Sequence, residues 1–227
     1  MQCVILAAGE GKRLRPLTEQ KPKPLVEVGG KTILDHIVEA LPSVIDELVL
    51  VVGYRADQIR AHCGDRFHSR RVQYVTQKNP ATGTGEALLC AKKLISGKFL
   101  LMYADDIHGS EALHRVVQEA HGMIGVYSQT PERFGVLMQN DDGTLRQIIE
   151  KPSNPTSNLV NVGGFVVDRS ILAYRPTCSD SGEILVTDML TEYAKRQPVR
   201  IIEQKLWIPV GYPEDVERAE VILKGLK

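Results

Sequence analysis

Short runs rich in β-branched residues alternate with amphipathic segments along the first half of this chain. We expect strands over residues 3–8, 48–52, 72–76 and 99–104, each bounded by Gly or Asp. Between them, residues 32–41 and 85–95 carry apolar side chains at helical spacing. Strand followed by helix, repeated along a chain, predicts an α/β fold with a mostly parallel sheet and helices on both sides.

The pattern changes after residue 122, where shorter strand-like runs follow one another. We expect strands over 123–128, 135–139, 145–150 and 159–167, a turn at 141–143, and helices over 183–195 and 213–225. No linker, repeat or low-complexity tract interrupts the sequence. We therefore predict one domain over residues 1–227, with a first lobe of about 1–122, a smaller second lobe of about 123–227, and a binding cleft between them.

Charge is balanced overall but uneven along the chain. The sequence has 28 Lys and Arg against 28 Asp and Glu, so no global field favours nucleic acid or an anionic membrane. Between Gly11 and Pro24, however, one acid (Glu19) stands among five cations. These cations are Lys12, Arg13, Arg15, Lys21 and Lys23. The cluster predicts a local site for an anionic ligand.

The cysteines and the apolar runs bear on the compartment. Cys3, Cys63, Cys90 and Cys178 are scattered, with no paired spacing typical of a zinc site or a disulfide framework. The apolar stretch at residues 3–8 is too short for a signal-peptide core, and no run approaches the ~20 apolar residues of a membrane span. We expect a cytoplasmic protein with no membrane partner.

Two glycines follow the first predicted strand. Gly9 and Gly11 leave room for backbone N–H groups to approach a phosphate. The dinucleotide-binding fingerprint is incomplete, because Leu14 stands where it needs a third Gly, and the Walker pattern is absent. Taken alone, the glycines fit a tight strand exit equally well.

A much longer composite motif surrounds these glycines. The segments VILAAGEGKRLRPLT (4–18), KPKPL (21–25) and VGGK (28–31) resemble the signature of the sugar-1-phosphate nucleotidylyltransferases. Further matches follow in the same order to the end of the chain: Gln77 with GTGEA (83–87), YAD (103–105), EKP (150–152), NVG (161–163), and Trp207 with Gly211. The resemblance implies a Rossmann-like three-layer sandwich and a reaction in which a nucleoside triphosphate and a sugar 1-phosphate give a nucleoside diphosphate sugar and pyrophosphate.

The resemblance also assigns the cations. It implies that Arg13 holds the β and γ phosphates, that Lys23 bridges toward the α phosphate, and that Lys151 holds the sugar phosphate. The chemistry needs them, because two like unit charges about 4 Å apart repel by roughly 4 kcal/mol at an effective dielectric of 20. We interpret Arg15, Lys21 and Lys31 as solvated surface cations.

A metal site is implied at the end of the run 99–104. Asp105 stands there, and a carboxylate beside substrate phosphates suits Mg²⁺. The family closes this site with the Asp of a Trp-x-Asp-x-Gly motif, but Pro209 occupies that position here. Three interpretations stay open: Mg²⁺ relies on Asp105 with substrate oxygens and water, a nearby acid such as Asp188 substitutes, or activity is weakened. We interpret Asp106 as a cap of the following loop that could help through a bound water.

Base and sugar contacts are implied by the same matches. Gln77 can read the edge of uracil or thymine, which favours a pyrimidine. The loop GTGEA (83–87) resembles that of the N-acetylglucosamine-1-phosphate uridylyltransferases, so UTP is favoured and dTTP is next. The other predicted nucleotide-binding residues are Leu6, Ala7, Ala8, Gly9, Gly11, Gly83 and Thr84. The predicted sugar-binding residues are Tyr103, Gly135, Glu150 and Asn161. Glucose and N-acetylglucosamine are not separated, and acetyl transfer is not expected because the chain ends soon after residue 225.

Two alternatives remain on sequence alone. The loss of an acid at Pro209 suits a non-catalytic regulatory subunit that binds nucleotide sugars. A cytidylyltransferase acting on a non-sugar phosphate would keep the phosphate-binding cations. Association with further copies of the same chain is left open.

Overall fold

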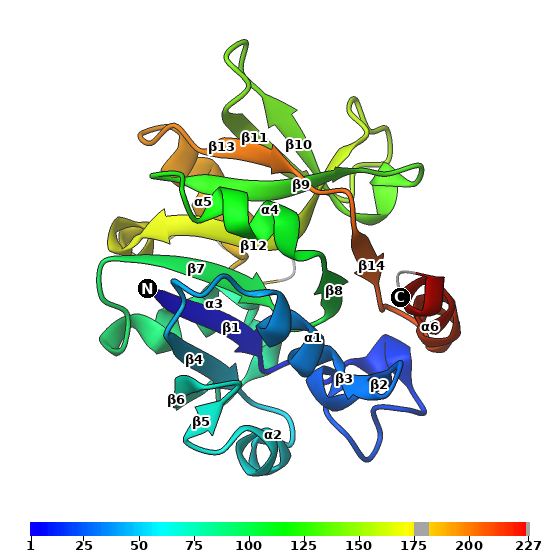
Figure 1. The fold of residues 1–227 in the computed structure, drawn as a ribbon. Coiled ribbons are helices and arrows are strands. Elements are labelled where there is room, and N and C mark those ends of the chain that lie inside the picture. The colour runs from blue at the N-terminus through cyan, green and yellow to red at the C-terminus, as the bar shows by residue number, and fades with distance from the viewer. Residues whose placement is uncertain (175–181, 226–227) are drawn as a thin grey trace.

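The computed structural model describes residues 1–174 and 182–225, so Cys178 lies outside the described residues (Figure 1). Parallel strands form the middle of the main sheet in the first half of the chain, in the order β7-β1-β4-β6, with β5 antiparallel at the edge. Their bounds are β1 Gln2–Ala7, β4 Glu47–Val52, β5 Arg66–Phe67, β6 Arg70–Thr76 and β7 Lys98–Tyr103. Every residue of β1 is buried, as expected of a parallel strand covered on both faces.

The second half of the chain extends the same sheet. Strand β12 pairs antiparallel with β7, so the hydrogen-bonded sheet continues from one half to the other. Beyond it lie β10 and β11, and β9 pairs with both β12 and β13. Their bounds are β9 Gly122–Tyr127, β10 Gly135–Gln139, β11 Leu145–Glu150, β12 Leu159–Asp168 and β13 Arg200–Glu203. The expected strands of this half are all present within a residue or two.

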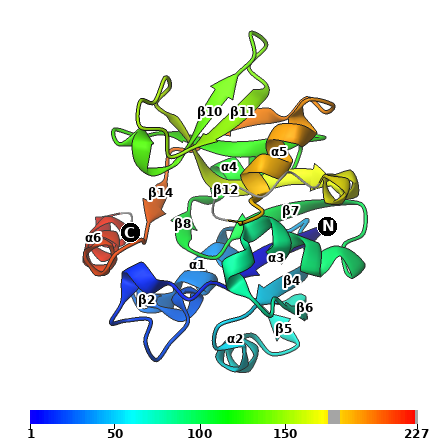
Figure 2. The same cartoon turned by 180° about the vertical axis from the view of Figure 1, so that it is seen from behind.

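Helices cover both faces of the sheet. Figure 1 shows α1 and α4 in front, and Figure 2 shows α3 and α5 on the opposite face. Two buried clusters match these faces, because alternate residues of β1 such as Ile5 and Leu6 pack with different helices. The helices are α1 Ile33–Ala40, α2 Ala56–Cys63, α3 Thr84–Cys90, α4 Ser110–Val116, α5 Val186–Ala194 and α6 Pro213–Gly225. The predicted α/β sandwich with a mixed sheet is confirmed.

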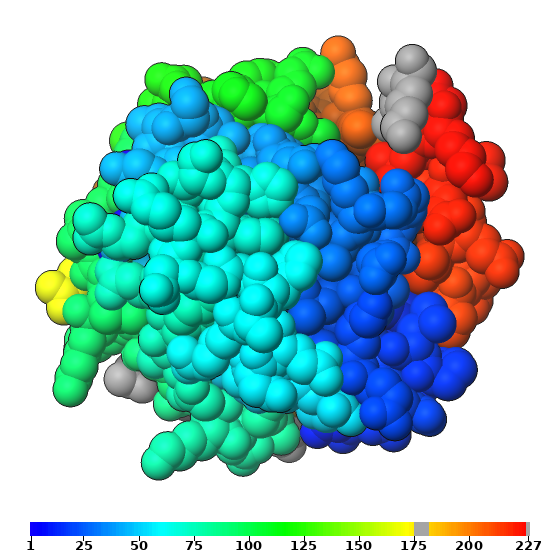
Figure 3. All heavy atoms as spheres, turned by 60° about the horizontal axis from the view of Figure 1, so that its bottom comes forward, coloured from blue at the N-terminus to red at the C-terminus, as the bar shows by residue number. Residues whose placement is uncertain are grey.

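Two small sheets complete the strands. The hairpin of β2 Glu27–Val28 and β3 Lys31–Thr32 follows the cationic segment. Strand β8 Asp106–His108 pairs antiparallel with β14 Trp207–Pro209, and this pairing brings the C-terminal part of the chain against the end of β7. Figure 3 shows the C-terminal helix in red beside the blue N-terminal segment, where Leu223 faces Gly29.

Helix α1 begins at a capping box. The Thr32 hydroxyl accepts a hydrogen bond from the Asp35 backbone N–H (3.0 Å), and the Asp35 carboxylate accepts one from the Thr32 backbone N–H (3.2 Å). The Nε2 atoms of two histidines reach the same carboxylate, His62 at 3.2 Å and His68 at 2.8 Å. Asp35 therefore ties α1 to α2 and to the β5–β6 turn.

The predicted helix over 183–195 needs a correction at its start. Helix α5 begins at Val186, because the preceding backbone pairs with another segment instead of coiling. The Ile184 N–H donates to the Thr82 carbonyl (3.0 Å), and its carbonyl accepts from the Gly85 N–H (2.7 Å). The predicted helix over 85–95 is likewise shorter, since α3 ends at Cys90 and a 3₁₀ turn follows over Ala91–Lys93. Within the described residues, no helix is long and apolar enough to cross a membrane.

Candidate functional site

A cavity of about 780 Å³ opens at the carboxyl ends of β1, β6 and β7. This is the edge at which parallel sheets place their ligand sites. All but two of the predicted site residues line it. Those that line it are Leu6, Ala7, Ala8, Gly9, Gly11, Arg13, Lys23, Gln77, Gly83, Thr84, Tyr103, Asp105, Glu150 and Lys151. Residues far apart in the sequence are therefore brought together as expected, and Gly135 and Asn161 lie behind the lining.

The loop after β1 has a backbone that requires glycine at one position. Gly11 has φ +64°, and a Cβ there would lie 3.0 Å from the Lys23 Cβ and 3.1 Å from a Thr18 methyl carbon. The Thr18 hydroxyl donates to the Gly11 carbonyl at 2.8 Å. This tight approach brings the short 3₁₀ helices Lys12–Leu14 and Lys23–Leu25 against each other.

The cations of this loop fall into two groups. Lys12 and Arg15 both reach Glu10, at 3.4 and 3.7 Å, so their charges are partly balanced. Arg13 forms no ion pair with any residue in 1–174 or 182–225. Its guanidinium carbon instead lies 5.5 Å from the centroid of the Tyr212 ring. Arg13 thus lines the cavity with its charge uncompensated.

Two other cations, Lys21 and Lys31, line a separate cavity. Lys21 pairs with Glu27 at 3.0 Å, and Lys31 pairs with Glu39 at 2.6 Å. They line a smaller cavity of about 440 Å³ beside α1. This placement agrees with their interpretation as surface cations outside the main cavity.

Lys23 and Asp105 face each other within the main cavity. The Lys23 Nζ lies 3.5 Å from an Asp105 carboxylate oxygen, and the whole of Lys23 is only 9% exposed. The Asp105 side chain is 44% exposed, so its oxygens stay open to a ligand. A buried ammonium is strongly disfavoured without a partner. The carboxylate supplies that partner at the point where β7 ends.

Asp106, next in the chain, has a structural role. One of its carboxylate oxygens accepts a hydrogen bond from the Trp207 indole nitrogen (3.0 Å), and the other accepts from the Val210 N–H (3.0 Å). Burial, followed by the nearby charge of Asp105, raises the pKa of Asp106 well above its ordinary value. Pro209 pairs directly with Asp106 across the β8–β14 ladder. Asp106 therefore fixes the strand that carries Trp207 and Pro209.

Four acids line the cavity, namely Glu10, Asp105, Glu150 and Glu183. Within the described residues, no group of three or more His, Cys, Asp or Glu side chains is arranged to hold an ion. Asp188 is not among the residues that line the cavity, and both oxygens of Asp106 accept protein hydrogen bonds. Mg²⁺ in phosphate-transfer sites commonly uses one or two carboxylates and completes its shell with water and substrate phosphates. Asp105 fits such a site, in which the substrate supplies much of the coordination.

Gln77 presents a defined face to the cavity. Its amide nitrogen donates to the Thr82 hydroxyl (3.2 Å) and to the Gly83 carbonyl (3.1 Å). The Thr82 hydroxyl itself donates to the Asn79 carbonyl (2.8 Å), so it must accept from Gln77, and this fixes the orientation of the amide. The Gln77 Oε1 accepts no hydrogen bond from the described residues. The cavity thus holds a positioned acceptor.

Sequence reasoning missed the segment before α5. Glu183 and Leu185 line the cavity, and Ile184 between them pairs with the backbone of residues 82–85. A Cβ on Gly85 would lie 2.6 Å from the Ile184 Cγ2 and 2.9 Å from its carbonyl oxygen. A Cβ on Gly83, which has φ +96°, would also meet the Ile184 carbonyl oxygen. These two glycines were the available signal that another backbone packs against this loop.

Thr187 was also missed, and its hydroxyl is unsatisfied. Thr187 lines the cavity, is 2% exposed, and its Oγ1 has no hydrogen-bond partner among the described residues. A buried hydroxyl without a partner is unfavourable. Because this oxygen has almost no accessible surface, a ligand in the cavity would reach it only if the Thr187 side chain rotated.

The two predicted residues behind the lining support residues that do line it. Gly135 pairs with Glu150 across the β10–β11 ladder, and a Cβ on Gly135 would lie 3.2 Å from a Glu150 carboxylate oxygen. Asn161 accepts a hydrogen bond from the Gly163 N–H at 3.0 Å, within an irregular stretch of β12. Burial raises the pKa of Tyr103, and hydrogen bonds to Thr84 and Asn161 lower it by less.

Lys151 has an unusual backbone. Its φ is +42°, a left-handed conformation that is unfavourable for a residue with a Cβ. Its N–H donates to the Phe134 carbonyl at 3.0 Å, which holds the chain in this conformation at the end of β11. Such outliers persist where the surrounding structure enforces them, and they are frequent in binding sites. The turn directs the start of the 151–158 loop at the edge of the cavity.

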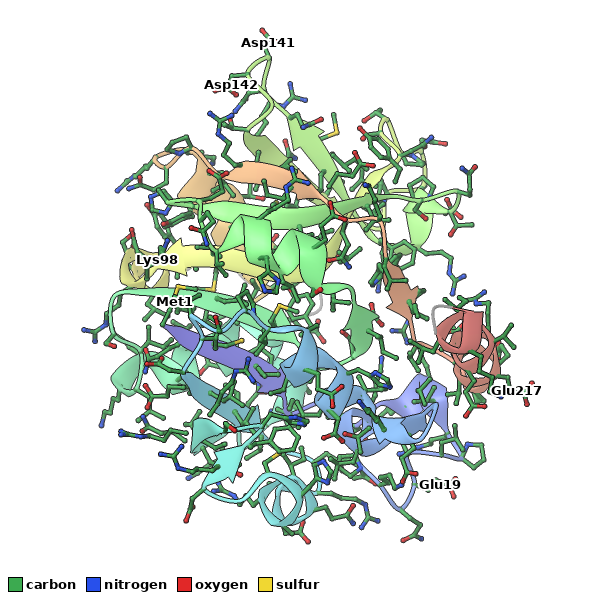
Figure 4. The ribbon with its side chains drawn as sticks, viewed as in Figure 1. Met1, Glu19, Lys98, Asp141, Asp142 and Glu217 are labelled. Carbon is green, nitrogen blue, oxygen red and sulfur yellow. The ribbon has the colours of Figure 1, made fainter. Side chains whose placement is uncertain are left out.

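Other charged features lie away from the cavity. Figure 4 shows Asp141 and Asp142 at the tip of the β10–β11 hairpin, and Glu19 and Glu217 on outer surfaces. Asp142 accepts hydrogen bonds from the Thr144 N–H (2.9 Å) and hydroxyl (2.6 Å), which accounts for it as a turn residue.

Comparison with known proteins places the whole arrangement in context. Residues 2–224 match the family model described as Nucleotidyl transferase. The bifunctional protein GlmU of Methanocaldococcus jannaschii is 34% identical over 226 residues, which is 98% of this chain and 54% of that protein. The UTP–glucose-1-phosphate uridylyltransferase AglF of Haloferax volcanii is 34% identical over 232 residues, covering 97% of this chain and 95% of AglF.

A solved structure gives the same picture for the fold. A candidate glucose-1-phosphate thymidylyltransferase from Bacillus anthracis superposes with a TM-score of 0.88 at 24% identity, covering 100% of this chain and 96% of that chain. The chain spans about half the length of the GlmU proteins it matches.

Proposed function

The chain belongs to the nucleotidyl transferase family, as its motifs predict, and on that premise we propose that it transfers a nucleotidyl group from a nucleoside triphosphate to a hexose 1-phosphate. UTP is the favoured donor and dTTP the next. The products are a nucleoside diphosphate sugar and pyrophosphate. The observation that carries this proposal is the cavity in which uncompensated Arg13, the Lys23–Asp105 pair and the Gln77 acceptor meet.

The choice of base rests on Gln77. Both hydrogen-bonding contacts of its amide nitrogen are made within the protein, so its oxygen is the group left for a ligand. Uracil and thymine carry an imide N–H that can donate to this oxygen. Cytosine has an acceptor at N3 and adenine at N1, so these bases could use the oxygen only through an exocyclic amino group, in a shifted position. This argues against a cytidylyltransferase, and the name of AglF, which specifies UTP, agrees with it.

The transfer itself needs positioning and neutralised charge more than covalent help. A phosphate oxygen of the sugar 1-phosphate attacks the α phosphorus, the bond from that phosphorus to the bridging oxygen of the β phosphate breaks, and pyrophosphate departs. Lys23 would draw the α phosphate toward the end of β7, and Arg13 would hold the departing pyrophosphate. Lys151 would hold the incoming phosphate at the opposite side of the cavity.

Mg²⁺ is the cofactor we propose, with Asp105 as its ligand from the protein. When bound, the ion would withdraw negative charge from the phosphate oxygens that complete its coordination. Asp105 also balances Lys23 when no phosphate is present. Pro209 stands where the resemblance implies a second carboxylate, so the substrate would carry a larger share of the coordination.

The sugar end is supported by polar groups near β11. Glu150 would accept hydrogen bonds from ring hydroxyls, and Tyr103, which also lines the cavity, is hydrogen-bonded to the buried Asn161. We propose a glucose or N-acetylglucosamine type of substrate and a cytoplasmic location, where such activated sugars are made from nucleoside triphosphates.

A grid of substrates tests this function. UTP, dTTP, CTP, GTP and ATP would each be combined with glucose 1-phosphate, N-acetylglucosamine 1-phosphate or choline phosphate in the presence of Mg²⁺, and pyrophosphate would be measured. We expect release with UTP to be fastest. Turnover with CTP and choline phosphate alone would contradict the proposal. No turnover with any pair, while UDP-sugar still binds, would favour a regulatory subunit.

A variant of Gln77 tests the choice of base. Gln77→Met keeps the length of the side chain but removes both the oxygen that faces the cavity and the donor to Thr82 and Gly83. We expect this variant to lose the preference for UTP over CTP and to retain binding of pyrophosphate, which lies at the other end of the nucleotide site.

A further inference from the structure

Tyr212 lies beside the phosphate-binding loop without belonging to any of its motifs. The Arg13 guanidinium carbon is 5.5 Å from the centroid of the Tyr212 ring, and Arg13 lines the cavity. Tyr212 follows Gly211, which also lines the cavity, directly after the β14 segment. An aromatic ring from the C-terminal part of the chain thus contacts the cation expected to hold pyrophosphate.

The ring is held in place from two sides. The backbone N–H groups of Gly211 and Tyr212 both donate to one oxygen of the Asp215 carboxylate, each at 2.9 Å. Asp215 is only 6% exposed, and its other oxygen accepts from Arg218 at 2.6 Å. A second guanidinium, that of Arg133, lies 5.6 Å from the centroid of the same ring. The position of Tyr212 is therefore fixed independently of Arg13.

The kind of contact suits a phosphate site. A carboxylate would also hold Arg13, but it would compete with the phosphate for the guanidinium charge. An aromatic face attracts a cation through its quadrupole and leaves the net charge unchanged. Lys12 and Arg15 pair with Glu10, whereas the Arg13 charge stays uncompensated among the described residues. The ring can thus orient Arg13 without weakening its attraction for phosphate.

We infer that Tyr212 is a positioning residue that holds Arg13 toward the polyphosphate of the nucleotide. The inference rests on the proposed function, because it assigns Arg13 to the β and γ phosphates. Arg133, in the second half of the chain, also holds the Tyr212 ring through a cation–aromatic contact with its guanidinium group. Asp106 anchors the pairing of β8 with β14, and this pairing places Tyr212, which follows β14, beside the phosphate-binding loop.

Calorimetric binding of UTP and of pyrophosphate tests this inference without requiring turnover. Tyr212→Leu is expected to weaken both by about two- to fivefold, the effect of a partly exposed cation–aromatic contact. Tyr212→Phe keeps the ring and is expected to restore parental affinity. In assays of turnover, the KM for nucleotide should rise while the KM for sugar 1-phosphate stays unchanged.

Two further comparisons separate positioning from a general effect on structure. In an Arg13→Met background, adding Tyr212→Leu should cause no further loss of affinity. Phenylalanine with increasing ring fluorination at position 212 should weaken binding in step with the loss of ring quadrupole, at nearly constant shape. Tyr74→Leu, which removes the Arg60–Tyr74 contact (4.6 Å) at the far edge of the sheet, should leave affinity unchanged.

The outcomes distinguish this inference from the proposed function. Equal UTP and pyrophosphate affinity in parent and Tyr212→Leu, with a loss in Arg13→Met, would overturn the role of Tyr212 alone. Parental affinity in Arg13→Met would overturn the phosphate role of Arg13 and with it the proposed function. If Tyr212→Leu does not fold, the fluorinated series decides, because a flat response to fluorination overturns the inference.

Discussion

The ammonium nitrogen of Lys23 lies 3.5 Å from a carboxylate oxygen of Asp105, although one follows the loop after β1 and the other the end of β7. The pair holds a cation and an anion at the same place in the cavity. An incoming phosphate can take the place of the carboxylate at Lys23, and the freed carboxylate can serve a metal. The pair therefore suits a phosphate that binds together with a metal cation, because Lys23 can contact the phosphate and Asp105 the cation.

Lys23→Met is expected to weaken UTP binding about 10- to 100-fold, because it removes a buried charge-assisted contact to phosphate. Isothermal calorimetry measures this directly. Lys31→Met is the matched control, since Lys31 has the same charge but pairs with Glu39 outside the main cavity. Equal affinities in the two variants would show that the charge of Lys23 is not used for the nucleotide.

The left-handed backbone of Lys151 predicts different stabilities for two variants that both lose its charge. At φ +42°, Lys151→Ala keeps the unfavourable conformation, whereas Lys151→Gly relieves it. We expect Lys151→Gly to be more stable than Lys151→Ala by about 1 kcal/mol in urea unfolding. Both variants should lose affinity for sugar 1-phosphate to the same extent. A Gly variant less stable than the Ala variant would contradict the assigned conformation.

The approach of Ile184 to the glycine loop predicts a steric effect. In Gly85→Ala the new methyl would lie 2.6 Å from the Ile184 Cγ2, so one of the two segments must move. We expect a loss of about 2 kcal/mol in the free energy of unfolding, together with weaker UTP binding. Gly225→Ala, where no atom lies within 4 Å, serves as the control and should not be destabilised. A stable Gly85→Ala protein would show that the loop does not depend on this packing.

Much of the site could be predicted because its residues sit in contiguous motifs. Arg13, Lys23 and Asp105 each stand at the end of a recognisable strand or in a cationic segment, and parallel strands bring such ends to one edge. Gly83 and Gly85 indicate that some backbone packs closely against their loop, but the sequence does not identify Ile184 as the partner, because the contact is a backbone pairing between two irregular segments. The start of α5 was misplaced for the same reason.

Other features depended on three-dimensional contacts. The free oxygen of Gln77 follows from the orientation imposed by Thr82 and Gly83, which the sequence does not specify. Asp105 and Asp106 are adjacent residues of the same type, and only their contacts in the fold distinguish them. Trp207 and Val210 donate hydrogen bonds to the oxygens of Asp106, whereas Lys23 faces Asp105.

Asp35 predicts how stability depends on pH. Burial alone would raise the pKa of Asp35, but hydrogen bonds from Thr32 and His68 outweigh it and lower the pKa to about 2. Because this lies below the ordinary value of about 4, the carboxylate stabilises the fold above pH 4, and the contribution is lost as the pH falls toward 2. Asp35→Asn should therefore be about 2 kcal/mol less stable than the parent at pH 7, and the difference should shrink below pH 4.

Urea unfolding at a series of pH values checks this expectation. Asp141→Asn, at the exposed tip of the β10–β11 hairpin, is the control and should match the parent throughout. A gap between Asp35→Asn and the parent that stays constant from pH 7 to pH 2 would mean that the charge of Asp35 does not carry the effect.

The most direct test of the account is the initial rate of pyrophosphate release from UTP and sugar 1-phosphate as Mg²⁺ is titrated, in the parent and in Asp105→Asn. We predict that the parent requires Mg²⁺, that a chelator abolishes its activity, and that Asp105→Asn is slower by about 100-fold or more even at saturating Mg²⁺. A parental rate in Asp105→Asn, or an undiminished rate without divalent metal, would contradict the claim that Asp105 and the cavity cations together bring the two phosphates into reaction.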